Sequence, residues 1–458
     1  MTKNITKLEQ YAKYFFKRIF GYRYLHRGNI RSYQLERINE ILRYARENSP
    51  FYSQIYKDSI SSLNTLDDIK RLPILKKEVF KKAIQENTIL CKGFNKSDLH
   101  CGHTTGSTGT PLEVCFDNEC VNKRKLVLDR LNRDMRILPH KRVVKIWRDK
   151  KLSKAEQKLK DAGLFLFISV GDVNSPISTA VTKEKLENIL KELEAFDPHV
   201  IRGYVSALYS IASLAEIYNV KFRSLESVVA SAEYLPSHLW DYFEKVFGCP
   251  VYNLYGGTEA PGIAVNKRGS RNLTISEDLY FIEVLDENGN DVKPGEVGII
   301  TITDLHSKAL PLIRYQIGDM AIVDENFYML TNDFRYFSSV IGRTNDIFEL
   351  EDGSLIYSHL WFVYFREYEW INRFKVIQYE HKRIHIQLEL KNGFDFKLSE
   401  LKSRIEKLYP SVDFTWEIVE KFDLDKGGKF RSVISYVPNK FNFLNKEDLS
   451  GDNKVKKI

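Results

Sequence analysis

HTTGSTGTP, residues 103–111, places two glycines and five hydroxyl side chains within nine positions. Glycine reaches backbone conformations that other residues avoid, and backbone N–H groups and hydroxyls in such a loop can hold phosphate oxygens. The stretch is not a Walker A loop, because no Gly-Lys-Ser/Thr follows it. A surface loop without a ligand is an equally weighted alternative. The candidate phosphate-binding residues are Thr104, Thr105, Gly106, Ser107, Thr108, Gly109 and Thr110.

Around this loop, from about residue 100 to 342, short apolar strands alternate with helical stretches. RVVKIW (142–147) and PVYNLY (250–255) read as strands, and KEKLENILKELEAF (183–196) has helical spacing. Such alternation indicates layered α/β structure. Segment 281–304 predicts antiparallel strands joined by a turn.

After Gly342 the pattern changes. FKVIQYE (374–380) and RIHIQLEL (383–390) alternate as in an exposed hairpin, KLSELKSRIEKLYP (397–410) has helical spacing, and SVISYV (432–437) reads as a strand. These elements predict a small α+β domain of roughly 110 residues.

The composition excludes several classes of protein. The chain has 458 residues, of which 43% are hydrophobic and 28% charged, so a wholly disordered chain is excluded. The net charge of +8 is mild, and basic runs such as Arg148–Lys151 are short and interleaved with acids, so we expect no nucleic-acid partner. A basic protein that binds nucleic acid or a membrane surface is the competing class, and it would need positive charge concentrated on one face.

The N-terminal segment predicts helices. Glu9 interrupts the apolar core that a secretion signal needs, and no apolar run approaches the roughly 20 residues of a membrane span. The basic, aromatic stretch Tyr11–Tyr24 is expected to dock on its own domain, with a peripheral membrane contact as the alternative. We therefore expect a cytoplasmic protein without a transmembrane segment.

The five cysteines form no CxxC pair, and their number is odd. This pattern argues against a disulfide framework and fits free thiols in a reducing compartment. A metal site at Cys91, Cys101 and His103 is the less favoured alternative, because the usual paired zinc-ligand spacings are missing. The cysteines are Cys91, Cys101, Cys115, Cys120 and Cys249.

YNLYGGTEAPG (252–262) is the second chemical signal, since it combines an aromatic ring, two glycines, a hydroxyl and a carboxylate after an apolar strand. An aromatic face can stack on a nucleotide base, and a carboxylate can hold Mg²⁺ between phosphates. A turn around a buried tyrosine explains the segment equally well on its own.

Three later segments each offer one polar group. Asp319 in LPLIRYQIGDM follows a strand-like run and could accept hydrogen bonds from ribose hydroxyls, or could cap a turn. Arg343 in IGRTNDIF could contact phosphate or ribose oxygens. Lys429 in DKGGKFRS follows a double glycine, where a solvated basic turn is the default.

Taken in order, these five blocks resemble those of the adenylate-forming superfamily of acyl- and aryl-CoA ligases, luciferases and peptide-synthetase adenylation domains. Within it, the chain is similar to the phenylacetate–CoA ligase branch and its CapK-like members of surface-polysaccharide loci. The segments that carry this closer resemblance are ILRYARENSPFYSQIY (41–56), RLPILKKEVF (71–80), IRGYVSALYSIASLA (201–215) and SAEYLP (231–236).

The resemblance implies a two-step reaction with ATP, Mg²⁺ and a small-molecule carboxylate. The carboxylate attacks the α-phosphate, which gives an acyl-adenylate and pyrophosphate, and CoA or an amine or sugar acceptor then takes the acyl group. A surface-polysaccharide role is the implied setting. The alternatives are a catabolic aryl-CoA ligase of the phenylacetate type and a non-catalytic nucleotide-binding homologue that acts as a scaffold.

The resemblance also implies a role for each matched residue. Thr104 to Thr110 would hold the β- and γ-phosphates, Thr258 would contact the α-phosphate, and Glu259 would bind Mg²⁺. Lys429 would offset the negative charge that grows during adenylation. The adenine and ribose pocket would comprise Ala232, Glu233, Asn253, Tyr255, Gly256, Asp319 and Arg343, and the substrate pocket would include Tyr204, Gly257 and Ala260.

The fold implied is α/β, with a large N-terminal lobe of layered α/β subdomains (1–343) and a small mobile α+β lobe (344–458) on a hinge. Asn345 stands where the family usually has the hinge aspartate, with Asp346 beside it, so the pivot is one of these two residues.

Overall fold

The computed structural model describes most of the chain, with gaps at both ends and in several loops. The described residues are 28–57, 61–103, 112–147, 151–169, 183–329, 331–343, 347–352, 355–357, 361, 364–365, 368, 370–391, 397–422 and 432–437.

An eight-stranded sheet forms the centre of the large lobe, in the order β13-β9-β8-β7-β6-β5-β3-β4. β4, β3, β5, β6 and β7 are parallel, and β8, β9 and β13 extend the sheet antiparallel. β6 is buried along its whole length, as expected for a strand covered on both faces. The strands are β3 (Val143–Trp147), β4 (Phe165–Ser169), β5 (Val200–Tyr204), β6 (Ser227–Ser231), β7 (Val251–Tyr255), β8 (Ala264–Asn266), β9 (Leu273–Ile275) and β13 (Tyr336–Phe337).

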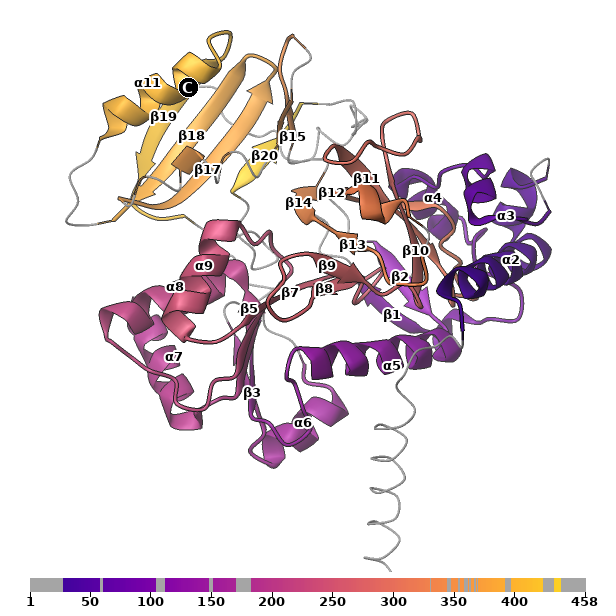
Figure 1. Ribbon diagram of the computed structural model, residues 1–458, viewed down its shortest axis with the longest axis horizontal. Helices are drawn as coiled ribbons and strands as arrows, with labels where there is room; N and C mark the ends of the chain where they lie inside the picture. Colours follow the sequence, from indigo (N-terminus) through magenta and orange to yellow (C-terminus); the bar gives the residue numbers. More distant parts are fainter. Residues whose placement is uncertain are drawn as a thin grey trace, which may run out of the picture.

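Helices cover both faces of the parallel part of this sheet (Figure 1). Three helices pack on one face through a shared apolar core, namely α7 (Lys183–Phe196), α8 (Val205–Ile217) and α9 (Ser237–Phe247). α5 (Asn118–Asp134) packs against the opposite face through Val127 and Leu131, and α6 (Lys154–Asp161) lies between β3 and β4 in the chain. The alternation predicted for this region is therefore confirmed as α/β structure.

A second, antiparallel sheet of four strands lies beside the first and shares its larger core with the N-terminal helices. Its strands are β10 (Tyr280–Leu285), β11 (Val297–Asp304), β12 (Tyr315–Ile322) and β14 (Ser339–Arg343). The helical segments are α2 (Ile30–Asn48), α3 (Pro50–Ile55), η1 (Leu66–Arg71), α4 (Lys77–Gln85), η2 (Lys96–Asp98) and η3 (Glu325–Phe327).

The helices predicted near the N-terminus are confirmed for α2 and α3. Asn29 caps α2 through its side chain, and Ser49 ends α2 and caps α3, which begins at Pro50. The basic, aromatic stretch Tyr11–Tyr24 lies outside the described residues. Within the described part of the chain, each helix is too short or too polar to cross a bilayer.

The small lobe has its own sheet and its own apolar core, as predicted for an α+β domain. β17 (Ile371–Glu380) and β18 (Arg383–Leu390) form the predicted hairpin, but they are the central strands, flanked by parallel neighbours. The N–H of Val376 donates to the carbonyl of Ser432 at 2.7 Å, just before the edge strand β20. The other elements are α11 (Leu398–Leu408), β15 (Ile347–Glu349), β16 (Leu355–Tyr357), β19 (Asp413–Val419) and β20 (Val433–Ser435).

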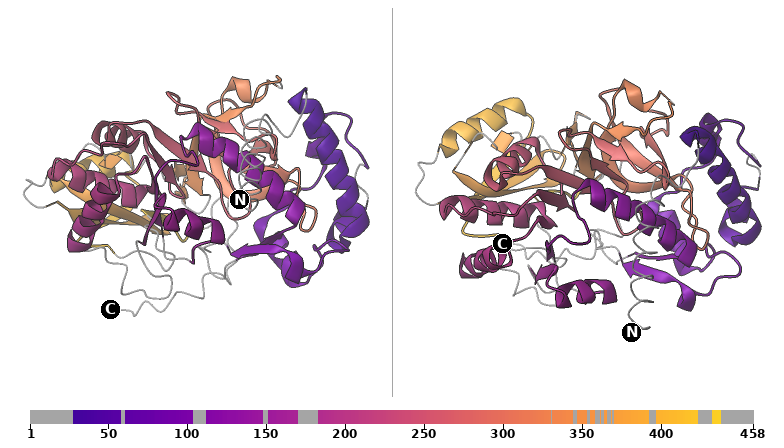
Figure 2. Two further views of the ribbon diagram at one scale, coloured as in Figure 1. Left: turned by 90° about the horizontal axis from the view of Figure 1, so that it is seen from below. Right: turned by 60° about the horizontal axis from the view of Figure 1, so that its bottom comes forward.

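Figure 2 shows that the N-terminal helices and the small lobe lie at opposite ends of the molecule, as they do in Figure 1. The predicted boundary between residues 343 and 344 stays a prediction, because residues 344–346 lie outside the described part.

One disulfide corrects the prediction that all five cysteines are free. Cys101 and Cys115 face each other across a two-stranded ribbon, β1 (His100–His103) and β2 (Glu113–Phe116), and are bonded. The two cysteines are 14 residues apart in the sequence. The loop 104–111 between them was predicted, but the two strands that flank it and bring the cysteines together were not. Cys91, Cys120 and Cys249 are free, as predicted, and the structure shows that all three are buried. The only group of potential metal ligands among the described side chains is Cys101, Glu113 and Cys115, without Cys91.

A buried carboxylate ties α2 to the large lobe. Glu277 Oε1 lies 2.6 Å from Nη1 of Arg31 on α2 and 2.6 Å from Nε of Arg335. Burial alone would raise the pKa of Glu277, but the two guanidinium groups outweigh it and hold the pKa below its ordinary value.

We expect Glu277→Gln to lower the free energy of unfolding by about 3–5 kcal/mol, because it leaves two buried cations without their shared anion. Urea denaturation measures this loss. The lowered pKa means that the stabilisation is complete above the carboxyl group's unfolded pKa and is lost as the pH falls through the folded pKa. The deficit should therefore shrink in acid. Glu192→Gln, on the exposed face of α7, is the control; a similar loss there would contradict the assignment.

Candidate active site

Three predicted blocks meet at the end of β7. The hydroxyl of Tyr255 donates to Oδ2 of Asp319 at 2.8 Å, although 64 positions separate the two residues. Asp319 on β12 is in turn paired with Arg343 on β14 in the register of the second sheet. The structure thus brings together the predicted adenine-stacking and ribose-binding residues, with the backbone of Arg343 beside them.

The other predicted adenine-pocket residues come from neighbouring strand ends. Asn253 precedes Tyr255 by two positions, so both side chains leave the same face of β7. On the adjacent strand β6, the hydroxyl of Ser231 donates to the carbonyl of Leu254 at 2.8 Å. Ala232 follows with a φ of +68°, a conformation that few residues other than glycine adopt, and Glu233 comes next, half-buried. The carboxyl ends of β6 and β7 therefore bring these residues of the predicted pocket to one edge of the sheet.

Residues 256–260 form a compact turn that requires glycine at its start. Gly256 has a φ of +158°, and a Cβ there would lie 2.6 Å from the nitrogen of Gly262 and 2.9 Å from the carbonyl oxygen of Ala260. The N–H of Gly257 donates to that carbonyl at 3.0 Å, and Ala260 is fully buried. The turn therefore fixes the direction of the two residues between them, Thr258 and Glu259.

Glu259 is buried beside two cations that the sequence analysis missed. Nζ of Lys77, at the start of α4, lies 3.3 Å from Oε1 of Glu259. Nη2 of Arg124, on α5, donates to the carbonyl of Glu259 at 3.0 Å and also pairs with Asp304. Lys77 lies in RLPILKKEVF, one of the segments that carry the resemblance to the phenylacetate–CoA ligase branch. That resemblance concerns the segment as a whole and does not single out the side chain of Lys77.

The charge of Arg124 is secured in spite of its burial. Desolvation alone would lower its pKa, but Tyr280 and Asp304 outweigh that effect and hold the pKa above its ordinary value. Its guanidinium carbon lies 3.8 Å from the ring centre of Phe116 on β2. Arg124 therefore links the turn at Glu259 to the second sheet and to the ribbon.

The substrate-pocket prediction for Tyr204 remains a prediction. Tyr204 is buried at the end of β5, and its ring stacks on that of Trp147 with centres 4.2 Å apart. Trp147, at the end of β3, was not among the predicted site residues, because it was read only as an apolar residue of the predicted strand. The stack places two aromatic rings at the carboxyl ends of adjacent strands.

Several predicted residues lie outside the described part of the chain and stay predictions. These are the phosphate-loop residues Thr104 to Thr110, the hinge residues Asn345 and Asp346, and Lys429.

Comparisons with known proteins find similar sequences and a similar fold. Residues 163–305 match the family described as AMP-binding enzyme, and residues 349–436 match the CapK C-terminal domain. Protein CapK of Staphylococcus aureus is 24% identical, over 94% of this chain and 94% of its own length. A phenylacetate-coenzyme A ligase of Thermus thermophilus is 24% identical, over 70% of this chain and 72% of its own.

The fold matches that of a 2-hydroxyisobutyryl-CoA ligase in complex with 2-HIB-AMP. The TM-score is 0.70 at 18% sequence identity, and the match covers 88% of this chain and 89% of the ligase. The predicted two-lobe α/β fold is therefore confirmed.

We expect Gly256→Ala to lower the free energy of unfolding by about 2–3 kcal/mol, because its Cβ would meet backbone atoms that cannot move without opening the turn. Thermal or urea unfolding measures this. Gly269→Ala is the matched control, since Gly269 also has a positive φ but faces open space, and it should cost only about 1 kcal/mol. Equal losses in the two variants would show that the close approach at Gly256 is not the cause.

Proposed function

We propose that this chain is an adenylate-forming ligase of the branch that includes CapK and the phenylacetate-CoA ligases, and that it couples ATP to a small-molecule carboxylate. The products of the first step would be an acyl-adenylate and pyrophosphate. The observation that carries the proposal is the contact of Tyr255 with Asp319, beside Arg343 in the strand register. It supports a nucleotide cradle built from three distant blocks.

Catalysis would rest on positioning and on charge. A carboxylate is a poor acyl donor, and its adenylate is a good one because AMP leaves readily. Tyr255 would offer its ring to the base, Asp319 would accept hydrogen bonds from the ribose, and Thr258 would face the α-phosphate. Holding two reactants in line accelerates their reaction without covalent help from the protein.

The cations near the turn would supply the charge that polyphosphate chemistry needs. Lys77 is close enough to Glu259 to approach the same phosphates, and Lys429 is proposed to reach the acyl-phosphate oxygens. The buried carboxylate of Glu259 is an oxygen ligand of the kind that Mg²⁺ prefers, so the residues fit this ion. Bound Mg²⁺ would neutralise phosphate charge.

The second step would pass the acyl group to CoA or to an amine or sugar acceptor. The likeness to Protein CapK spans nearly the whole chain. The first candidate is an amine or sugar acceptor from surface-polysaccharide synthesis in the cytoplasm, the setting that the resemblance of the sequence blocks implies. The likeness to phenylacetate-coenzyme A ligase favours CoA, which makes catabolic aryl-CoA ligation the second candidate. Incubation with ATP, the carboxylate and CoA separates the two candidates, because only the second candidate gives a CoA thioester as its final product.

We expect carboxylate-dependent exchange between ATP and pyrophosphate, tested across a panel of aryl, acyl and amino acids. Lys429→Ala should abolish the exchange and keep the unfolding midpoint, because it removes charge stabilisation and leaves every residue of the described core unchanged. Lys421→Ala, in the same lobe, is the control. Exchange with none of the acids would favour the scaffold alternative, and full exchange in Lys429→Ala would remove the role given to that lysine.

Lys77→Met should lower the rate of exchange about tenfold, the typical effect of losing a hydrogen bond to a charged group. It should also lower the Mg²⁺ concentration for half-maximal exchange, because Oε1 of Glu259 is no longer shared with Lys77. Glu259→Gln should shift this concentration upward. Lys82→Met, an exposed residue on the same helix, should change neither quantity. An unchanged Mg²⁺ requirement in both site variants would exclude Glu259 as the metal ligand.

A further inference from the structure

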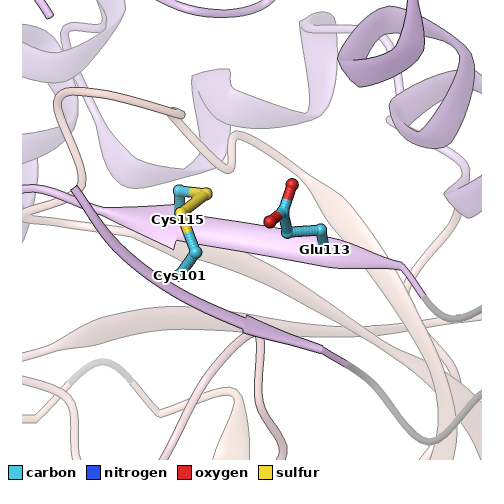
Figure 3. Close-up of side chains that lie close together, drawn as sticks. All are labelled: Cys101, Glu113 and Cys115. Carbon is cyan, nitrogen blue, oxygen red and sulfur yellow. A yellow bond between two sulfur atoms is a disulfide. The ribbon is translucent and has the colours of Figure 1, made fainter. Parts of the chain in front are cut away.

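A disulfide lies beside the candidate active site. Cys101 on β1 and Cys115 on β2 are direct partners in the ribbon and are bonded to each other. Figure 3 shows Glu113 on the same strand as Cys115, and this carboxylate pairs with Lys96. Cys101 is exposed and Cys115 is buried, so solvent reaches the pair from the side of Cys101.

The neighbours of the two cysteines connect the ribbon to the turn at residues 258–259, directly from β1 and through Arg124 from β2. Gly102 follows Cys101, and a Cβ there would lie 3.0 Å from the methyl group of Thr258. Phe116 follows Cys115, and its ring lies under the guanidinium of Arg124, which holds the carbonyl of Glu259. The disulfide is therefore one residue away from the site on each strand.

We propose that Cys101 and Cys115 form a thiol–disulfide switch, in which the disulfide holds the ribbon against the turn and the dithiol form binds ATP more weakly. The proposal rests on the proposed function, since it names a control of the same nucleotide site. The bond fixes the spacing of the two strands at the point where each contacts the site. Its loss leaves only the short ladder of four residue pairs between β1 and β2.

The switch needs an external dithiol. A thiolate of the dithiol attacks the sulfur of Cys101, the exposed residue of the pair, the S–S bond breaks, and Cys115 leaves as a thiolate that takes up a proton. The second thiol then attacks the mixed disulfide and releases Cys101. Two electrons pass to the protein, the reductant ends as a cyclic disulfide, and its two S–H protons are balanced by those on the two cysteines.

The remaining cysteines do not offer a competing reactive thiol. Burial raises the pKa of Cys91 and of Cys249 to about 12, and it raises that of Cys120 as well. A thiol with a raised pKa is almost wholly protonated at neutral pH and exchanges slowly. Exchange is therefore directed to Cys101, because exposed disulfides are the ones that reductants reach.

The test compares the full chain after treatment with oxidised glutathione and with dithiothreitol, and alkylation with mass spectrometry counts the free thiols. We expect reduction to raise the Kd for MgATP three- to tenfold, measured by calorimetry, and reoxidation to restore it. The double variant Cys101→Ser, Cys115→Ala should resemble reduced wild type and ignore dithiothreitol. Cys249→Ser should respond as wild type does. Reduction should also speed hydrogen exchange at the amides of Gly102 and Thr258.

An equal Kd in the two states, with unchanged hydrogen exchange, would overturn the switch. So would alkylation of Cys101 and Cys115 in the oxidised protein, or a response to dithiothreitol that persists in the double variant. If ATP binds neither form, the proposed function fails. The hydrogen-exchange comparison then still decides whether the disulfide holds the ribbon against Thr258, because that measurement needs no nucleotide.

Discussion

One buried guanidinium, that of Arg124, connects the parts on which the candidate site depends. It bonds the carbonyl of Glu259, pairs with Asp304 at the end of β11 and lies over the ring of Phe116 on β2. Its Nε has no hydrogen-bond partner among the described residues, so the aromatic face replaces part of its lost hydration. A buried cation stripped of one partner costs several kcal/mol, so Arg124 couples the positions of the turn, the second sheet and β2.

Each of the two sheets contributes residues to the candidate site. Parallel strands end at the same edge, and β6 and β7 therefore bring Ala232, Glu233 and Tyr255 together without further help. The antiparallel sheet contributes Asp319 and, opposite it, the backbone of Arg343. The hydroxyl of Tyr255 joins the two sheets at this point, and the same contact orients its ring. Structural support and ligand placement therefore depend on the same few bonds.

The sequence predicts what is local and misses what is long-range. The spacing of apolar residues identifies β7, α7 and the hairpin of β17 and β18, because positions close in the sequence alternate between buried and exposed in a way that is typical of each element. The contact of Lys77 with Glu259 joins residues 182 positions apart, and no spacing rule reaches that far. The motif order did predict a different long-range pair, since it placed Tyr255 and Asp319 in one site. The strands β1 and β2 were missed because four residues each are too short to show a period.

The edge strand β20 of the small lobe limits where Lys429 can act, because the two are close in the sequence. β19 ends at Val419, and Phe422 stays beside the sheet because its N–H donates to Glu389 at 3.0 Å. The chain rejoins the sheet at Ser432. Lys429 precedes Ser432 by three residues, so a fully extended tether allows about 11 Å between their Cα atoms. Lys429 therefore stays close to the edge strand of the small lobe. For Lys429 to act at a greater distance from Ser432, the whole lobe has to move.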